Sequence, residues 1–365
     1  MKRLTRLRQG YGGQALVAVV AVSLSSHPIA AQSKGDQTVF AVGTARASRG
    51  HTATGAIEVP AGSDAALSIP VAVVHGAKSG PVLALLAGAH GTEYASIIAL
   101  EKLIPMINAD ELSGTVIIVP LLNVPSFVKV VPHLNPVDGK NMNRMYPGKA
   151  DGTQTERASL AITNQVVQQA DHVIDFHGGD IDESLRPYSY WNKTGRAAQD
   201  AISRGMVLAF GLDHIVITTG RPSDPAASVY FENTATTRGK PSIIVEAGHA
   251  GTVESSDLSA LVNGSLSVMR HLKMLPGEAV PIENPVWIDH LADVASEQGG
   301  IFYPIVKRGA YVSAGMKLGY VTDYVGKTLF EARAKESGVL LYVRAVPSIA
   351  KGDPIASIGV VGKAP

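Results

Sequence analysis

The sequence predicts an α/β protein in which a three-layer α/β/α domain with a mixed sheet precedes a small all-β domain. Two patterns carry this prediction. From about residue 37 to residue 276, short apolar strands alternate with stretches whose apolar residues recur at helical spacing. After Pro276 the chain consists of short β-rich pieces punctuated by glycine, without a helical pattern. We therefore expect a first domain over residues 37–276 and a small β-barrel or sandwich domain over residues 285–365.

The α/β part is built from repeated strand and helix patterns. A short buried strand at residues 82–87 runs directly into a glycine-rich loop, and the residues after that loop have helical spacing up to Ile107. Strands that alternate with helices imply a sheet that is covered on both faces. The other expected strands lie at residues 67–73, 116–120, 173–176, 215–218 and 242–245, and the other expected helices at residues 156–169, 196–210 and 258–272.

The C-terminal part contains a faint internal repeat. Residues 300–302 and 338–340 open two similar halves, each followed by further glycines. Two similar halves predict a small barrel-sandwich, which resembles biotinyl and lipoyl modules. No lysine stands at a hairpin tip in the context that those carriers use, so we do not expect a carrier function.

The overall composition limits the chemistry. The 365 residues carry a formal net charge of +1, without a long basic run after the first ten residues, so nucleic acid is not an expected partner. Cysteine is absent, which rules out disulfides, thiolate metal sites and a cysteine nucleophile. A metal ion would have to be held by histidine and carboxylate side chains.

The first 31 residues resemble an export signal. Four basic residues precede an apolar run over residues 15–24, and small residues follow, ending in Ala30 and Ala31. We expect cleavage near Ala31 and export, most simply to a bacterial periplasm. The apolar run is too short for a stable membrane anchor, and no second run follows, so no membrane span is expected in the mature chain.

Candidate metal ligands follow two of the predicted strands. His90 and Glu93 stand in the loop after residues 82–87, where Gly88 and Gly91 let the backbone turn sharply. A catalytic zinc commonly takes three nitrogen or oxygen ligands and keeps one position open for water. His177 is the candidate for the third ligand, because it ends another buried strand and ligands of open α/β sheets bind at the carboxyl ends of strands.

Four ordered motifs resemble the succinylglutamate desuccinylase/aspartoacylase family, whose members are relatives of the zinc carboxypeptidases. The resemblance covers roughly residues 65–275, with a β-rich tail that is also typical of bacterial members. It implies a zinc-carboxypeptidase-like α/β/α fold. The motifs are Gly88-Ala89-His90-Gly91-Thr92-Glu93, Asn135-Pro136-Val137-Asp138-Gly139-Lys140-Asn141-Met142-Asn143-Arg144-Met145-Tyr146-Pro147-Gly148, Asp175-Phe176-His177-Gly178-Gly179 and Val245-Glu246-Ala247-Gly248.

The resemblance also implies roles for individual residues. His90, Glu93 and His177 would bind one Zn²⁺ per chain, and Glu246 would be the general base that takes the proton of the attacking water. Asn143 and Arg144 would grip the substrate. A guanidinium suits a carboxylate, since its planar donors make two parallel hydrogen bonds, although Arg144 would also suit the oxyanion formed during attack.

Other side chains near these motifs have less definite roles. Many members of the family carry an arginine shortly before the Asn-Pro-x-Asp-Gly segment, and here His133 occupies the comparable place, which argues against succinylglutamate and N-acetylaspartate as substrates. Asp180 is a candidate for orienting His177 or for accepting an ammonium group of the substrate. Three aromatic residues would line a pocket or pack within an ordinary loop; they are Tyr188, Tyr190 and Trp191.

The function predicted from these residues is zinc-dependent hydrolysis of the amide bond of an N-acyl amino acid or a related carboxylate-bearing amide. An alternative keeps the zinc and changes the substrate, as an exported carboxypeptidase or amidase that acts on short peptides or cell-wall fragments. A non-catalytic binding protein on the same scaffold is a third possibility. Zinc content distinguishes that third possibility from the two enzymes.

Overall fold

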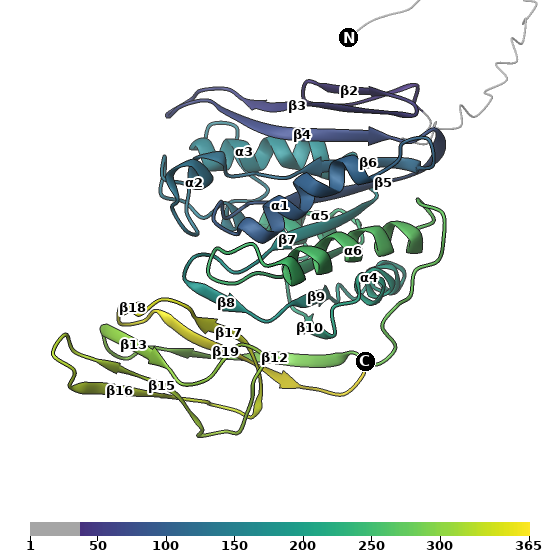
Figure 1. Cartoon of the computed structure of the whole chain (residues 1–365). Helices are drawn as coiled ribbons and strands as arrows, with labels where there is room; N and C mark the ends of the chain where they lie inside the picture. Colours follow the sequence, from purple (N-terminus) through teal and green to yellow (C-terminus); the bar gives the residue numbers. More distant parts are fainter. Residues whose placement is uncertain (1–36) are drawn as a thin grey trace, which may run out of the picture. The chain divides into compact units, whose positions relative to one another are not determined.

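The structure, a computed structural model, describes residues 37–365 (Figure 1). The expected export signal at residues 1–31 lies outside this part and stays a prediction, as does export itself. Within residues 37–365, none of the helices combines the length and the apolar character needed to cross a membrane.

A large mixed sheet of 13 strands forms the centre of the fold. In spatial order the strands are β14 (Tyr311–Val312), β17 (Gly338–Arg344), β19 (Pro354–Val361), β12 (Val286–Ala295), β10 (His214–Thr218), β9 (Tyr188–Asn192), β11 (Ser242–Glu246), β7 (His172–His177), β5 (Lys78–Ala87), β6 (Ser113–Val119), β4 (Leu67–His75) and β3 (His51–Val59), and β8 (Glu183–Leu185) pairs with β17. Strands β5, β6, β7 and β11 pair in parallel, whereas β3 and β4 are antiparallel at one edge.

Helices cover both faces of this sheet. Successive side chains of a strand point to opposite faces, so Leu83 and Leu85 of β5 pack with α1 (Tyr94–Leu103), α4 (Ala197–Phe210) and α6 (Ser255–His271). Ala84 and Leu86 pack with α3 (Gln154–Ile162) and α5 (Phe231–Thr237), together with the hairpin of β1 (Val39–Val42) and β2 (Ala45–Ser48). The three-layer α/β/α arrangement that the sequence predicts is confirmed (Figure 1).

Several predicted helices change their form at an end. The helix expected over residues 94–107 stops at Leu103 and continues as the 3₁₀ turn η2 (Ile104–Met106), because Pro105 cannot donate the next backbone hydrogen bond. The helix expected from Glu156 begins at Gln154, where Thr153 and Glu156 form a capping box, and passes into the π-helical turn η4 (Thr163–Val167). The short elements α2 (Val124–Lys129), η3 (Met142–Arg144) and η5 (Pro225–Ala227) were not predicted.

The C-terminal residues form strands only, as predicted. A second sheet of four strands has the order β16 (Thr328–Arg333), β15 (Lys317–Thr322), β13 (Gly300–Pro304) and β18 (Ser348–Ile349). Strands β12, β17 and β19 instead extend the large sheet, because β12 pairs in parallel with β10. The C-terminal strands are thus continuous with the α/β layer, and a domain boundary between Pro276 and Pro285 stays a prediction.

Candidate metal centre and substrate pocket

His90 and Glu93 stand in the sharp turn between β5 and α1. Gly88 adopts a φ of +71°, and a Cβ at Gly91 would come within 2.2 Å of the backbone nitrogen of Phe127. Both positions therefore require glycine. Glu93 is the residue immediately before α1, so its backbone belongs to the helix start while its side chain faces back towards His90.

His177 and Glu246 lie side by side at the ends of adjacent parallel strands. His177 ends β7 and is in register with Glu246, which ends β11; Glu246 is in turn in register with Tyr188 of β9. These three residues are cross-strand neighbours. Side chains of such neighbours point to the same face of a sheet, so the strand register places the base candidate beside a metal-ligand candidate.

The three predicted ligands converge, with one ligand atom of each lying within 4.8 Å of the others. Nδ1 of His90 lies 2.6 Å from Oε1 of Glu93, and Nδ1 of His177 lies 3.1 Å from Oε2 of the same carboxylate. Burial opposes ionisation of Glu93, but the two imidazoles outweigh it and lower its pKa to about 2. Burial likewise opposes protonation of His177, yet Asp175 and Glu93 raise its pKa well above the usual value.

The Nε2 atoms of His90 and His177 also have polar partners. Nε2 of His90 lies 3.2 Å from Oδ1 of Asn141. Nε2 of His177 lies 3.3 Å from Oδ1 of Asp175 and 3.0 Å from Nδ2 of Asn143. Both oxygens of Asp175 are buried, and neither accepts a hydrogen bond from any other group among residues 37–365. This carboxylate is placed to accept a hydrogen bond from Nε2–H of His177 whenever Nδ1 binds a metal.

Asp180, the sequence-based candidate for orienting His177, has other partners. Its carboxylate accepts hydrogen bonds from the hydroxyl of Thr92 and from the backbone nitrogens of Ile181 and His133. His133 also contacts Asp182 through Nε2 at 2.9 Å. Asp180 thus fixes the loops around the centre, and the carboxylate that lies next to Nε2 of His177 is that of Asp175.

The donor set fits zinc. Two imidazole nitrogens and one carboxylate converge from buried or half-buried side chains, and the orphaned carboxylate of Asp175 supports a neutral His177 bound through Nδ1. Calcium and magnesium prefer shells made entirely of oxygen. His90, Glu93 and His177 are therefore the residues that would hold the ion.

Glu246 faces the same pocket as the ligands. Burial raises its pKa well above the usual value, and the carboxylates of Glu93, Glu183 and Asp175 add to that rise, while His177 opposes it. A carboxylate with a raised pKa is suited to take up a proton and to return it later in the reaction. Glu183, which the sequence did not single out, lines the pocket as well, and burial raises its pKa to about 7.

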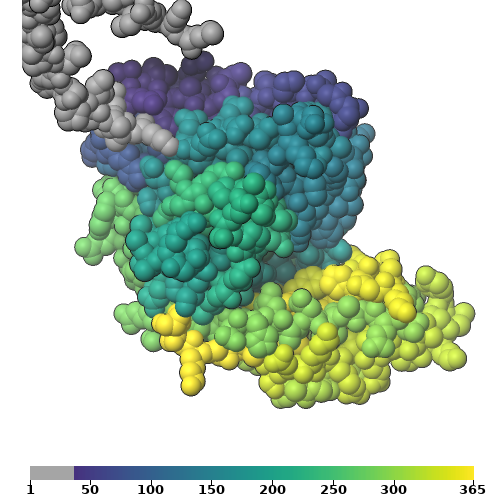
Figure 2. All heavy atoms as spheres, turned by 180° about the vertical axis from the view of Figure 1, so that it is seen from behind, coloured from purple at the N-terminus to yellow at the C-terminus, as the bar shows by residue number. Residues whose placement is uncertain are grey.

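The pocket in front of the ligands has a volume of about 590 Å³. Figure 2 shows the surface hollowed where the teal part of the chain meets the yellow C-terminal strands. Tyr188 and Tyr190 of β9 line this pocket, whereas Trp191, the residue after Tyr190, points to the other face and packs in the core. The sequence did not decide whether these three aromatic residues line a pocket or pack in the protein. Because side chains of a strand alternate between its two faces, two of them line the pocket and the third packs in the core.

Arg144 and a second arginine stand on another side of the pocket. The guanidinium carbon of Arg144 lies 4.7 Å from the ring centroid of Tyr230, and that of Arg221 lies 4.2 Å from the same ring. Both arginines line the pocket. The side chain of Asn143, by contrast, already has two protein partners. Its Oδ1 accepts a hydrogen bond from the backbone nitrogen of Phe231, and its Nδ2 contacts His177. A substrate contact through Asn143 stays a prediction.

The C-terminal strands supply the remaining wall. Across β12, β19, β17 and β8, four side chains stand in register and all line the pocket; we call them the outer row. Strand pairing alone sets this row, since its members come from distant parts of the sequence. The outer row consists of Asp293, Ser357, Tyr342 and Leu185.

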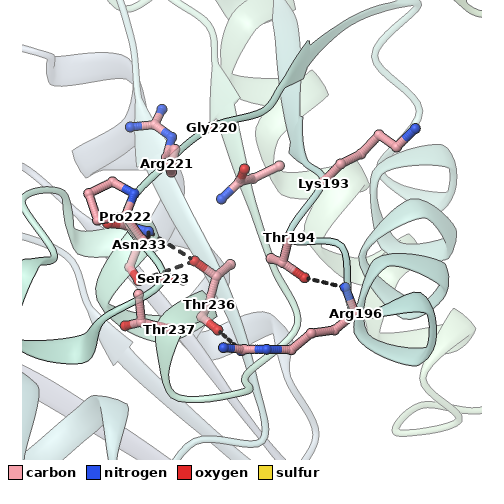
Figure 3. A pocket seen from close by; sticks show the side chains of 11 residues that line it. Lys193, Thr194, Arg196, Gly220, Arg221, Pro222, Ser223, Asn233, Thr236 and Thr237 are labelled. Carbon is pink, nitrogen blue, oxygen red and sulfur yellow. Dashed lines mark hydrogen bonds between the residues drawn. The ribbon is translucent and has the colours of Figure 1, made fainter.

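A smaller cavity of about 180 Å³ shares Arg221 with the pocket (Figure 3). Arg196 donates to the carbonyl of Thr236 at 2.9 Å in its wall. Nε of Arg221 lies 3.8 Å from Oε2 of the buried Glu232, which keeps the guanidinium at the boundary of the two cavities. None of the metal-ligand candidates lines the smaller cavity, so the candidate metal centre belongs to the larger pocket.

Comparison with known proteins agrees with this arrangement. Residues 79–272 match the family model for the succinylglutamate desuccinylase/aspartoacylase catalytic domain, and the chain belongs to this family. The resemblance seen in the four sequence motifs is therefore confirmed.

Individual relatives extend the match to the C-terminal strands. N-alpha-acetyl-L-2,4-diaminobutyric acid deacetylase from Halomonas elongata is 31% identical over 84% of this chain and 91% of its own length. The product-bound structure of the ectoine utilization protein EutE (DoeB) from Ruegeria pomeroyi has a TM-score of 0.77 at 26% identity, covering 85% of this chain and 95% of its own. A succinylglutamate desuccinylase from Silicibacter sp. has a TM-score of 0.77 at 25% identity, covering 90% and 96%.

Proposed function

We propose that this protein is a zinc-dependent deacylase that hydrolyses the amide bond of an N-acyl amino acid. The observation that carries the proposal is the convergence of His90, Glu93 and His177 beside Glu246, at the mouth of a pocket that also contains arginines. The deacetylase from Halomonas elongata, which is named for an N-acetylated amino acid, supports this substrate class.

Each residue has a defined task in this proposal. Zinc, when bound, supplies a polarised water and neutralises charge on the acyl oxygen. Glu246 takes a proton from the water and passes it to the departing amine. Asp175 keeps the ring of His177 in the tautomer that leaves Nδ1 free for the metal. Arg144 holds the carboxylate of the amino-acid part, which fixes the scissile bond in front of Glu246.

The pocket takes its lining from both the α/β part and the C-terminal strands. Tyr188 and Tyr190 line it from β9, and the outer row lines it from the C-terminal side. Charge stabilisation at the acyl oxygen is worth more beside such groups than in open solvent. We therefore assign the C-terminal strands a part in the active site.

A substrate panel tests the proposal. Zinc-loaded protein is incubated with N-acetyl, N-succinyl and longer N-acyl amino acids, and the release of free amine is measured, with Glu246→Gln as the control for contaminating activity. We expect turnover of at least one substrate class. C-terminal residues released from peptides, with no turnover of acyl amino acids, would instead support the carboxypeptidase alternative. None of the relatives named above carries the name of a peptidase.

A further inference from the structure

Asp293 is the only charged member of the outer row. It lies on β12 directly opposite Ser357 of β19, and the hydroxyl of Ser357 donates to Oδ1 of Asp293 at 2.6 Å. Asp293 is exposed to solvent, and this hydrogen bond orients its carboxylate at the pocket wall. Its second oxygen is left for another donor.

No lysine, arginine or histidine among residues 37–365 lies within 4.0 Å of the Asp293 carboxylate, as the ion pairs of that part of the chain show. Neighbouring acidic residues differ in this respect. Asp289, four residues earlier on the same strand, contacts His290, and Asp353 contacts Arg344. A carboxylate at a pocket wall without a cation of its own is free to pair with a cationic ligand.

Charge is divided within the pocket. Arg144 and Arg221 gather around Tyr230, whereas Asp293 stands on the wall formed by the C-terminal strands. The pKa of Tyr190 responds to charges of both signs. Burial raises the pKa of Tyr190 well above its usual value, with Glu246 and Asp293 adding to the rise and Arg221 opposing it. The negative charge of Asp293 thus acts on Tyr190, which lines the same pocket as Glu246.

We propose that Asp293 determines substrate specificity by binding a second, positively charged amine on the amino-acid part of the substrate. The preferred substrates are then N-acyl diamino acids, whose carboxylate binds the arginine side of the pocket while their free ammonium binds Asp293. The inference rests on the proposed function for the identity of the pocket. Its chemistry agrees with the name of the Halomonas elongata relative, a deacetylase of an acetylated diaminobutyric acid.

An ordinary solvated aspartate is the simplest competing explanation. Many exposed carboxylates lack a partner, because an exposed ion pair adds little stability. Asp293 differs through its place in a row that lines the pocket and through its clamp by Ser357. A charged hydrogen bond that becomes buried when the substrate binds is worth more than an exposed one.

Two substrates of the same chain length separate the explanations. N-α-acetyl-2,4-diaminobutyrate carries the second amine, and N-acetyl-2-aminobutyrate lacks it. In zinc-loaded Asp293→Asn, which keeps the shape and the acceptor for Ser357, we expect kcat/KM for the diamino substrate to fall roughly ten- to hundredfold. The value for N-acetyl-2-aminobutyrate is expected to stay within about threefold, because that substrate has no ammonium group for Asp293 to bind.

Asp289→Asn provides the matched control. It removes an equal charge from the same strand at a position that is 72% exposed and does not line the pocket. We expect both substrates to behave as with the wild-type protein. Equal losses for the two substrates in Asp293→Asn would overturn the inference and leave Asp293 a structural role only.

Binding of the amine product tests Asp293 without turnover. Calorimetric titration of zinc-loaded protein with 2,4-diaminobutyrate, compared with 2-aminobutyrate, is expected to show tighter binding of the diamine that disappears in Asp293→Asn. If neither acylated substrate is hydrolysed while this binding difference holds, the proposed function fails and the specificity assignment survives. If hydrolysis occurs but the two products bind equally well to wild type and variant, the specificity assignment fails alone.

Discussion

Asp175 and His177 stand two residues apart on β7, and the carboxylate of Asp175 lies 3.3 Å from Nε2 of His177, whose Nδ1 faces Glu93 instead. A strand period of two places both side chains on one face. The ring is therefore held between two carboxylates, of which only Glu93 belongs to the candidate ligand set.

The first prediction concerns metal content. The wild-type protein should carry about one zinc per chain, since the ligand set has three members and one open position. His177→Ala should lose zinc and activity together, as measured by elemental analysis and turnover. His51→Ala, an exposed histidine of β3, is the control and should keep its metal. A fully loaded His177→Ala protein would refute the ligand assignment.

The second prediction concerns Asp175. Asp175→Asn should lower zinc affinity roughly ten- to hundredfold, because an amide is a weaker acceptor for the Nε2 proton. Competition with a chelator measures the affinity. Asp180→Asn is the comparison, because Asp180 contacts Thr92 and His133 rather than His177. A larger loss of zinc in Asp180→Asn would restore Asp180 as the orienting residue.

The third prediction concerns the base. Glu246→Gln should keep zinc and substrate binding but lower turnover by roughly two to four orders of magnitude, the usual contribution of a positioned acid–base group. Steady-state kinetics and metal analysis on the same preparation provide both readouts. Unchanged turnover would transfer the role to another carboxylate, and Glu183 is the one that shares the pocket.

The fourth prediction concerns Arg144. Arg144→Lys keeps the charge but should still reduce kcat/KM, because an ammonium cannot reproduce two parallel hydrogen bonds or the stacking on Tyr230. Converting the substrate carboxylate to an amide should cost the wild-type enzyme about as much as Arg144→Ala does. Combined, the two changes should cost little more than either one. Losses that simply add would assign Arg144 to the oxyanion instead.

The fifth prediction concerns stability at low pH. Hydrogen bonds from Lys140 and from the backbone nitrogen of Thr153 lower the pKa of Glu156 to about 2. A pKa that is depressed on folding gives stability above the unfolded value of about 4.5 and loses it as pH falls towards 2. The difference in unfolding free energy between wild type and Glu156→Gln should therefore be largest near neutral pH and should shrink between about pH 4.5 and pH 2.

Urea unfolding of both proteins at several pH values measures that difference. Glu101→Gln, an exposed position on α1, is the matched control and should show a small difference from wild type at every pH. A difference for Glu156→Gln that stayed constant down to pH 2 would contradict the role of the Lys140 contact.

The layers of the fold could be predicted because the spacing of apolar residues and the length of each apolar segment distinguish strands from helices in this part of the chain. Residues 82–87, 173–176 and 242–245 all lie within observed strands. Strand β9 was missed, since its aromatic residues alternate between pocket and core rather than between water and core. Helix α5 was missed because Phe231–Thr237 is rich in threonine, which has a low helix propensity.

The site was predicted where its chemistry is local in sequence. His90, Glu93, His177 and Glu246 follow strands and belong to short motifs, so one sequence was enough to single them out. Asp175 lies inside an apolar strand, where a carboxylate resembles an ordinary polar interruption. Its position two residues before a candidate ligand, on the same face of a strand, was the available signal.

The remaining pocket residues had no such local signal. Arg221, Tyr230 and Asp293 reach the pocket through loops and strand pairings that join distant segments. Register between β12 and β19 depends on the folded sheet, and no short motif encodes it. Specificity is therefore harder to predict from this sequence than the reaction class.

The continuity of β12, β17 and β19 with the large sheet has a consequence for the order of events during synthesis. A ribosome makes His90 and Glu93 early, whereas Ser357 is among the last of these residues to appear. A nascent chain thus contains the candidate metal ligands before the C-terminal residues of the pocket wall. The proposed discrimination between substrates therefore depends on the part of the pocket that is synthesised last.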